Sequence, residues 1–202
     1  MKVGVLASGF GSNLQALLDT VHGRDGIEIV GVASDKRDAR ALQRAIDAGV
    51  QTATFPLDEY PDRPARDDAM ADWLTRRGVE LVVLAGYMQL LSASFLGRFA
   101  GQVINVHPAL LPAFPGLRAV EQALDYGVKV FGVTVHYVDD GVDTGPVILQ
   151  RAIELPDARD ADEVLEALHQ IEHELLPEAV RLIARGAVGR DPERPRRIRI
   201  DR

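Results

Sequence analysis

The chain has 202 residues, 47% hydrophobic and 26% charged, a composition typical of an ordinary globular protein with a sizeable core. Its net charge of −7 argues against broad nucleic-acid binding, which needs a basic surface. Because it has no cysteine, disulfides, thiol nucleophiles and thiolate metal sites are excluded. Without a membrane-length apolar run or a secretory signal, the sequence predicts a cytoplasmic protein that does not enter a membrane.

The first half of the chain alternates short apolar runs with segments of helical spacing. Glycines stand at the ends of two of these helical segments, and glycine readily adopts the positive φ that closes a helix. The alternation predicts an α/β fold with a doubly wound, mainly parallel sheet. Strands are predicted at 2–7, 27–33, 50–55 and 81–85, and helices at 13–21, 39–48 and 63–77.

The pattern changes after a short buried strand at 102–106. A helix at about 120–125 is followed by two strands, 128–138 and 147–153, that are joined without room for a helix, so we expect an antiparallel part of the sheet. A last helix begins after Asp160, and Pro177 should kink or break it. We predict a single domain over residues 1–186 and a polar, arginine-rich tail over 187–202.

Asn105 and His107 stand at the end of the strand predicted at 102–106. Residues two apart on a strand point to the same side, so the amide and the imidazole are directed at one point. An amide N–H stabilises a developing oxyanion, and histidine moves protons near neutral pH. By itself the pair is equally compatible with a strand end whose polar groups are bound by backbone.

A glycine-containing segment, Ser8-Gly9-Phe10-Gly11-Ser12-Asn13, joins the first strand to the first helix. Glycines let the backbone approach a ligand, and a helix N-terminus offers free N–H groups to a phosphate. The segment is not a dinucleotide fingerprint, because Leu14 takes the third glycine position, and it lacks the Gly-Lys-Ser/Thr ending of a P-loop. It is a candidate monophosphate site, and the alternative is an ordinary turn.

An acidic loop follows the strand predicted at 128–138. Its carboxylates, Asp139, Asp140 and Asp143, could bind a hard cation, although their spacing is not that of a calcium loop. Alternatively, one of them partners a histidine, fixing its orientation and favouring its charged form. We favour Asp143, which precedes a Thr-Gly-Pro turn, for this second role.

Three further features allow two interpretations each. His169 and His173 form an H-x-x-E-H pattern that could ligate zinc, but Pro177 follows one turn later, and we favour polar residues that line a cleft or cap the kink. His136 is expected to be a hydrogen-bonded structural histidine on an inner strand. Residues 88–91 follow a predicted strand, where α/β sheets bind ligands, and form either an apolar pocket wall or a plain loop.

Taken together, these segments resemble the phosphoribosylglycinamide formyltransferases, the folate-dependent family of purine synthesis. The resemblance reaches to about Gly186. The Asn-x-His and Asp set is shared by the wider formyltransferase superfamily, whereas the Gly-Ser-Asn start and Phe114-Pro115-Gly116 are more specific. The motifs that carry it are Ser8-Gly9-x-Gly11-Ser12-Asn13-Leu14-Gln15-Ala16, Leu84-Ala85-Gly86-Tyr87-Met88, Asn105-x-His107-Pro108-x-Leu110-Leu111-Pro112 and Asp143-Thr144-Gly145-Pro146.

The resemblance implies transfer of the formyl group of 10-formyltetrahydrofolate, as co-substrate and without a metal, to the amine of glycinamide ribonucleotide. Asn105 and protonated His107 would stabilise the tetrahedral oxyanion, and His107 would carry protons from the amine to the departing folate nitrogen. Asp143 would keep His107 charged, with an ordered water. The implied partners are these small molecules, with no nucleic acid or membrane, and we expect a monomer or homodimer.

The resemblance also implies the binding residues. Gly11, Ser12 and Asn13 would hold the phosphate, and Glu172 the rest of the ribonucleotide. Arg63 would meet the folate tail. The remaining folate-binding residues would be Met88, Gln89, Leu90, Leu91, Asn105, Asp139, Asp140, Gly141, Val142 and Asp143. The chain departs from many relatives at Ala113, where a basic or polar residue is common, and Arg118 is a candidate substitute.

Two alternatives are kept. Formyltetrahydrofolate deformylase uses the same triad with water as acceptor, but it carries an additional amino-terminal domain, whereas here a strand begins at Lys2. A methionyl-tRNA formyltransferase, another member of the same superfamily, would carry a further domain after Gly186. A non-catalytic Rossmann-type nucleotide-binding module is the second alternative, and it predicts that Asn105, His107 and Asp143 do not converge.

Overall fold

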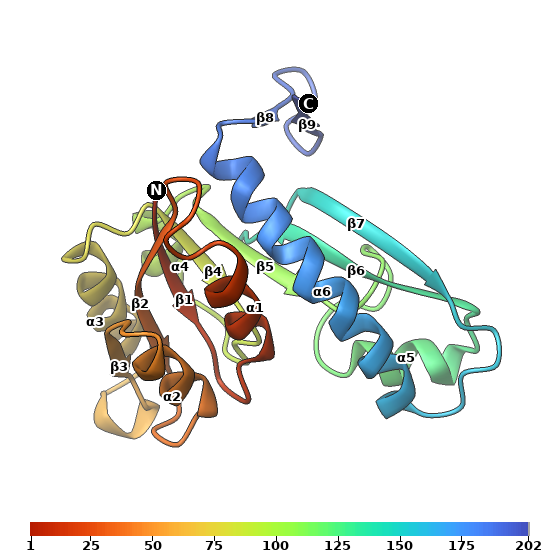
Figure 1. Ribbon diagram of the computed structural model, residues 1–202, viewed down its shortest axis with the longest axis horizontal. Coiled ribbons are helices and arrows are strands. Elements are labelled where there is room, and N and C mark those ends of the chain that lie inside the picture. The colour runs from red at the N-terminus through yellow and green to blue at the C-terminus, as the bar shows by residue number, and fades with distance from the viewer. Residues whose placement is uncertain (202) are drawn as a thin grey trace. The chain divides into compact units, whose positions relative to one another are not determined.

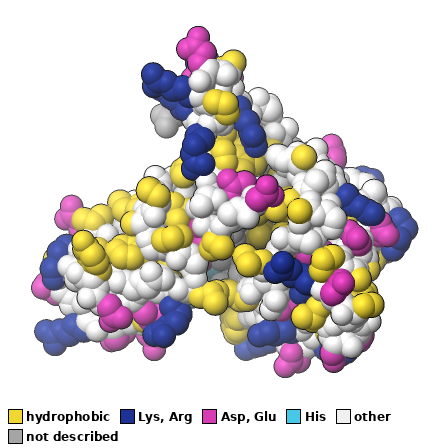
Figure 2. Space-filling view, turned by 180° about the vertical axis from the view of Figure 1, so that it is seen from behind, with side chains coloured by type: hydrophobic (Ala, Val, Ile, Leu, Met, Phe, Trp, Pro, Cys, Tyr) yellow, Lys and Arg dark blue, Asp and Glu magenta, His cyan; other side chains and the backbone are white. Residues whose placement is uncertain are grey.

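The computed structural model describes residues 1–201. They form two compact units, Met1–Ile104 and a second unit that begins at Asn105. No helix in the described residues is both long and apolar enough to cross a membrane. Acidic and basic side chains are intermingled on the face shown in Figure 2, with hydrophobic side chains between them.

The first unit is built on four parallel strands in the order β3-β2-β1-β4. Val5 on the central strand lies beside Val32 of β2 and Val83 of β4, and all three are buried. The elements are β1 (Lys2–Leu6), α1 (Ser12–Thr20), β2 (Glu28–Ser34), α2 (Arg40–Asp47), β3 (Thr52–Thr54), the 3-10 turn η1 (Leu57–Glu59), α3 (Arg63–Thr75), β4 (Leu81–Leu84) and α4 (Ala93–Arg98). Every strand and helix predicted for this part is present (Figure 1).

Close packing of α3 on the strands depends on two glycines. A Cβ atom at Gly4 of β1 would lie 2.7 Å from Leu74, and one at Gly31 of β2 would lie 2.6 Å from Trp73. Real Cβ atoms do not come so close, so these glycines let the helix lie directly on the sheet. The helices also pack in pairs, α1 with α2 and α3 with α4.

The second unit continues from β5 (Val103–His107), with strand order β5-β6-β7. β6 and β7 pair antiparallel, as predicted, and α6 packs along both of them (Figure 1). The other elements are α5 (Ala119–Tyr126), β6 (Val130–Tyr137), β7 (Val147–Glu154), α6 (Ala161–Ala184), β8 (Val188–Arg190) and β9 (Ile198–Ile200). The predicted fold class, α/β with a mainly parallel sheet and an antiparallel part near the C-terminal half, is confirmed.

Pro177, predicted to kink or break the last helix, does not break it, because α6 continues through it to Ala184. Proline inside a helix costs about 3 kcal/mol, since it removes one hydrogen bond and crowds the preceding turn. Leu175, Leu176 and Val180 beside it are buried. Burial of each such side chain contributes about 1.5–3 kcal/mol, so packing outweighs the local defect.

The segment predicted as a polar, arginine-rich tail over 187–202, of which Arg202 lies outside the described residues, contains a small antiparallel hairpin, β8 with β9. Its arginines make specific contacts within the second unit. Arg190 lies over the ring of Tyr137, 5.3 Å from its centroid, and Arg196 donates to the carbonyl oxygen of Thr144 at 2.7 Å. The segment therefore reaches the acidic loop between β6 and β7.

Candidate active site

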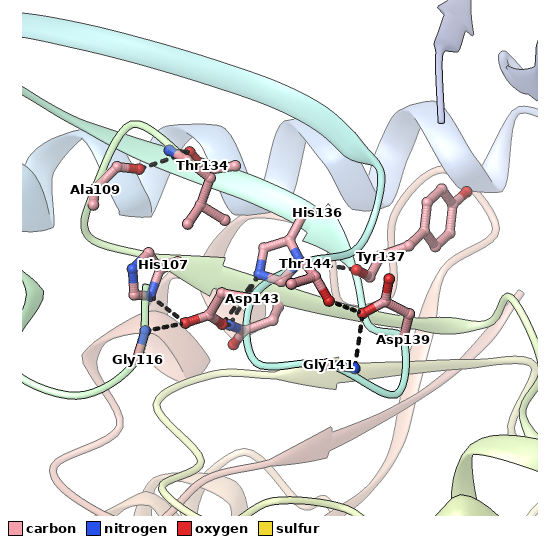
Figure 3. A network of polar contacts seen from close by, with 12 residues as sticks. His107, Ala109, Gly116, Thr134, His136, Tyr137, Asp139, Gly141, Asp143 and Thr144 are labelled. Atoms are coloured by element: carbon pink, nitrogen blue, oxygen red, sulfur yellow. Dashed lines mark hydrogen bonds and ion pairs between the residues drawn. The ribbon is translucent and has the colours of Figure 1, made fainter. Parts of the chain in front are cut away.

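Asn105, His107 and Asp143 converge in the second unit (Figure 3). The Asn105 amide donates to Oδ1 of Asp143 at 3.4 Å, and Nδ1 of His107 lies 3.3 Å from Oδ2. Strand β5 supplies the first two residues, and the loop between β6 and β7 supplies the carboxylate. The convergence that a non-catalytic module excludes is therefore present.

Both ring nitrogens of His107 face oxygen acceptors. Nε2 lies 2.8 Å from the carbonyl oxygen of Phe114, while Nδ1 faces the Asp143 carboxylate. A carbonyl or an ionised carboxylate can only accept, so only a ring protonated on both nitrogens donates to both. The imidazole side chain is only 6% exposed, so both contacts are largely shielded from water.

The Asp143 carboxylate is held ionised by its neighbours. Burial alone would raise its pKa, but contact with His136, the backbone N–H of Gly116 and the charges of His107 and His136 outweigh that effect. Together they lower the pKa of Asp143 from 3.8 to about 2. The Gly116 N–H donates to Oδ2 at 2.7 Å, the shortest of these bonds (Figure 3). The site therefore keeps a fixed negative charge at neutral pH.

Two residues that bind His107 have strained backbones. Asp143 and Phe114 both have φ of 53°, in the left-handed region. For an L-residue this conformation costs roughly 1–2 kcal/mol, less for aspartate than for phenylalanine. Such strain persists where surrounding contacts fix it, commonly at functional sites. Here it aims the Phe114 carbonyl and the Asp143 carboxylate at the same imidazole.

His136, interpreted from sequence as a structural histidine, also belongs to this cluster. Its Nδ1 donates to the Tyr137 carbonyl at 2.8 Å, so Nε2 is the ring nitrogen that faces Asn105 and Asp143. That atom lies 3.3 Å from the Asn105 amide nitrogen and 3.6 Å from Oδ1 of Asp143. His136 thus orients both the amide and the carboxylate.

The sequence held a signal for this position that we did not use. Thr134 and His136 alternate on a buried strand, as Asn105 and His107 do, so both polar side chains face one side. The pairing of β6 with β7 also shifts between Val135 and His136. Such irregularities re-aim side chains next to active sites.

Thr134 fixes the chain that leaves His107. Its hydroxyl donates to the Ala109 carbonyl at 2.6 Å and accepts the Leu111 N–H at 3.1 Å (Figure 3). Gln150 on β7 donates to both the Leu111 carbonyl and the Thr134 hydroxyl. The chain that leaves His107 is therefore held by hydrogen bonds from β6 and β7.

The acidic loop is organised by Asp139 and Gly145. Oδ1 of Asp139 accepts the Thr144 hydroxyl at 2.5 Å and the Gly141 N–H at 3.2 Å (Figure 3). A Cβ atom on Gly145 would overlap the Tyr137 carbonyl oxygen. Asp140, Gly141 and Val142 are exposed. Within residues 1–201, no three His, Cys, Asp or Glu side chains are grouped as ligands for a metal ion.

The predicted phosphate-binding residues lie in the first unit, where α1 begins. Gly11 is the N-cap with φ of 78°, and no side chain caps this helix end. Its Cβ would lie 2.7 Å from the Cα of Ala41, so the loop packs directly on α2. Ser12 is half-buried and Asn13 is buried. The first N–H groups of α1 are thus left without a side-chain cap.

The first unit also contains the residues predicted to bind folate outside the acidic loop. Arg63 is the exposed first residue of α3. Met88, Gln89 and Leu90 are exposed, and Leu91 is half-buried. Residues 88–91 follow β4, at the carboxyl end of a parallel strand, as the sequence predicted.

On α6, Glu172 is buried, and His169 and His173 stack with ring centroids 6.1 Å apart. Burial, and next the charge of His169, lower the pKa of His173.

Within residues 1–201, neither Ala113 nor Arg118 forms a hydrogen bond or ion pair with Asn105, His107 or Asp143. Ala113 is exposed, and its N–H donates to the Leu110 carbonyl at 3.1 Å. Arg118 is exposed and pairs with Glu121 at 3.5 Å.

A family model described as formyl transferase matches residues 1–180. The chain is 44% identical over 183 residues to phosphoribosylglycinamide formyltransferase of Mycobacterium tuberculosis, covering 91% of this chain and 85% of that one. It is 42% identical to the trifunctional purine biosynthetic protein adenosine-3 of Drosophila pseudoobscura over 95% of this chain, but spans only 14% of that relative's length. It superposes on glycinamide ribonucleotide transformylase 1 from Symbiobacterium toebii with a TM-score of 0.94 and 45% identity, over 99% of this chain and 93% of that one.

Proposed function

The chain belongs to the phosphoribosylglycinamide formyltransferase family, and from that premise we propose that it transfers the formyl group of 10-formyltetrahydrofolate to the amine of glycinamide ribonucleotide. Such a family implies a folate-type one-carbon donor. The observation that carries the proposal is the cluster of Asn105, His107 and Asp143. It combines an amide donor, an imidazole and a fixed carboxylate, which are the groups that this reaction requires.

The proposed reaction begins when the neutral amine of the ribonucleotide attacks the formyl carbon. A new C–N bond forms, and the carbonyl electron pair moves onto oxygen to give a tetrahedral oxyanion. The Asn105 amide and the His107 imidazolium stabilise this charge. The intermediate collapses when the bond to the folate nitrogen breaks, with one proton leaving the amine and one proton reaching that nitrogen through His107.

The contacts within the cluster are weak enough for a substrate to replace them. Asn105 donates at 3.3 and 3.4 Å, and the His107–Asp143 distance is 3.3 Å, at the long end of the hydrogen-bond range. A substrate oxygen, or a water on Asp143, can replace such weak bonds at small cost. The stronger 2.8 Å bond to Phe114 keeps the ring oriented meanwhile.

Asp143 acts through His107 in this scheme. Its pKa of about 2 keeps the carboxylate ionised, so its field favours the charged imidazole. His136 supports the arrangement because it contacts both Asn105 and Asp143.

The binding roles follow from the family. We assign the ribonucleotide phosphate to Gly11, Ser12 and Asn13, whose helix end has no side-chain cap, and the rest of the ribonucleotide to Glu172. We assign the folate tail to Arg63. The pterin is assigned to Met88, Gln89, Leu90, Leu91, Asn105, Asp139, Asp140, Gly141, Val142 and Asp143. Exposed Met88 and Leu90 support this assignment because a flat apolar ligand would cover them.

The assay that tests the proposal follows the fate of the formyl group. Purified protein is supplied with 10-formyltetrahydrofolate, with or without glycinamide ribonucleotide, and both formylated ribonucleotide and formate are measured. A transferase forms formylated ribonucleotide and releases almost no formate without the acceptor. Formate release at the full turnover rate in its absence would instead identify a deformylase.

A further inference from the structure

An exposed apolar segment in the first unit is fixed at both of its ends. It runs from Met88 to Leu91, between β4 and α4. Met88 is 60% exposed and Leu90 56% exposed, although the residues that flank the segment, Tyr87 and Ser92, are buried. Side chains so exposed gain little from packing, so their position depends on the backbone that carries them.

The amino-terminal end of the segment is held by Ser8. The Ser8 hydroxyl accepts the Met88 N–H at 2.9 Å, and the Ser8 N–H donates to the Gly86 carbonyl at 3.0 Å. Ser8 is only 3% exposed, so these bonds are shielded from water. They join the end of β1 to the chain that leaves β4.

The carboxyl-terminal end is held by Asp67 of α3. Oδ2 of Asp67 accepts the Ser92 N–H at 2.7 Å, while Oδ1 accepts both Nε and Nη2 of Arg66 at 2.9 and 2.7 Å. The side chains of Arg66 and Asp67 are 1% and 0% exposed. Ser92 then caps α4, since its hydroxyl accepts the Phe95 N–H at 3.3 Å.

A buried ion pair of this kind is a poor source of stability. Removing two charges from water costs about as much as their attraction returns, and apolar replacements are often neutral or stabilising. What the Arg66–Asp67 pair provides is a charged acceptor aimed at one backbone N–H. Charge-assisted bonds are roughly twice as strong as neutral ones, so Asp67 fixes the position of Ser92 firmly.

We propose that Asp67, with its counterion Arg66, and Ser8 are positioning residues that hold the donor-binding segment 88–91 in place. This inference rests on the proposed function, in which that segment contacts the flat ring system of the folate donor. Held at both ends, Met88 and Leu90 present an apolar surface that is ready before the donor arrives. Binding then does not need to order the segment, a step that would lower the affinity for the donor.

The test compares Ser8→Ala and Asp67→Asn with Asp72→Asn as a matched control. Asp72 forms an exposed ion pair with Arg98 that also joins α3 to α4, but it has no bond to the segment. We expect the KM for 10-formyltetrahydrofolate to rise about tenfold in Ser8→Ala and Asp67→Asn, the effect of one lost hydrogen bond. The KM for the ribonucleotide and kcat should stay within about twofold of wild type.

Three outcomes would overturn the inference: unchanged donor KM in both variants, equal rises in both KM values, or the same donor effect in Asp72→Asn. If Asp67→Asn does not fold because Arg66 is left unpaired, Ser8→Ala decides alone, since it removes no charge. Wild-type protein that fails to transfer formyl groups contradicts the proposed function instead. If the wild type transfers formyl groups and both variants have the same kinetics as Asp72→Asn, only the positioning role is contradicted.

Discussion

Asp143 illustrates how single residues carry this site. Its backbone is strained, its side chain is mostly buried, and it contacts two histidines and an amide. Sequence reasoning selected it because a carboxylate before a tight turn suits a histidine partner. His136 was not selected, because one histidine on an inner strand gives no indication of which loop will fold over it.

The lowered pKa of Asp143 makes a prediction about stability. A carboxylate whose pKa falls on folding contributes its full stability above its unfolded pKa, and loses it as the pH falls through the folded value. For a shift from 3.8 to about 2, the loss lies between about pH 4 and pH 2. We expect Asp143→Asn to lower the free energy of unfolding at pH 7. Between pH 4 and pH 2, the free energy of unfolding should fall less steeply in this variant than in the wild type.

Urea unfolding at pH 7, 4 and 2.5 measures this difference. Asp140→Asn is the control, because Asp140 is an exposed neighbour in the same loop. An equal fall in the free energy of unfolding between pH 4 and pH 2.5 for wild type and Asp143→Asn would contradict this prediction.

At the scale of elements, loops are positioned by the strands and helices beside them. The acidic loop depends on a glycine that lies against β6, and the glycine-rich loop lies against the first turn of α2. Neither contact can be read from local sequence, because each depends on how the loop folds back onto a neighbouring element.

Gly145→Ala should lower kcat while the protein still folds. The added methyl group would overlap the Tyr137 carbonyl, so the loop that carries Asp143 must move. Displacements of about 1 Å at reacting groups can cost on the order of 10²-fold in rate. Steady-state kinetics measures the effect, with Gly97→Ala in α4 as control, since a Cβ there meets open space. Equal kcat in both variants would show that the loop tolerates the shift.

Arg44 of α2 is predicted to support phosphate binding. Its guanidinium donates to the Phe10 carbonyl at 2.9 Å and to Gln15 at 2.8 Å, and it lies over the Phe10 ring. These contacts hold the loop before α1. We expect Arg44→Ala to raise the KM for the ribonucleotide about three- to tenfold, without changing the donor KM.

The control for Arg44 is Arg37→Ala, because Arg37 pairs with Asp58 and Glu59 on the surface. A rise in the donor KM, or equal effects in the two arginine variants, would refute the supporting role of Arg44.

At the scale of the whole molecule, periodicity predicted the fold class because strands and helices alternate at clear spacings. It missed α4, a six-residue helix too short to show a period, and it overestimated the effect of Pro177 because tertiary packing outweighs one lost bond. The hairpin of β8 and β9 escaped prediction because three-residue strands are too short to show alternation. Asn105, His107 and Asp143, which motif spacing and chemistry predicted as a site, lie close together in the structure.

The account also predicts that either substrate stabilises the folded chain. A ligand that binds only the native state adds about 2.7 kcal/mol at a hundredfold excess over Kd. We expect the ribonucleotide and a non-reactive folate analogue each to raise Tm in a thermal scan, with inorganic phosphate as a control for phosphate alone. Failure of both ligands to shift Tm would contradict the assigned binding roles.

The most direct test of the central claim is the single-turnover rate of formyl transfer by His107→Ala. Circular dichroism and the ligand-induced Tm shifts should match wild type, because the variant leaves the binding segments intact. The account predicts a rate about 10²–10⁴-fold lower, since proton transfer and oxyanion stabilisation are lost together. Near-normal transfer by a folded, ligand-binding His107→Ala would remove His107 from the reaction.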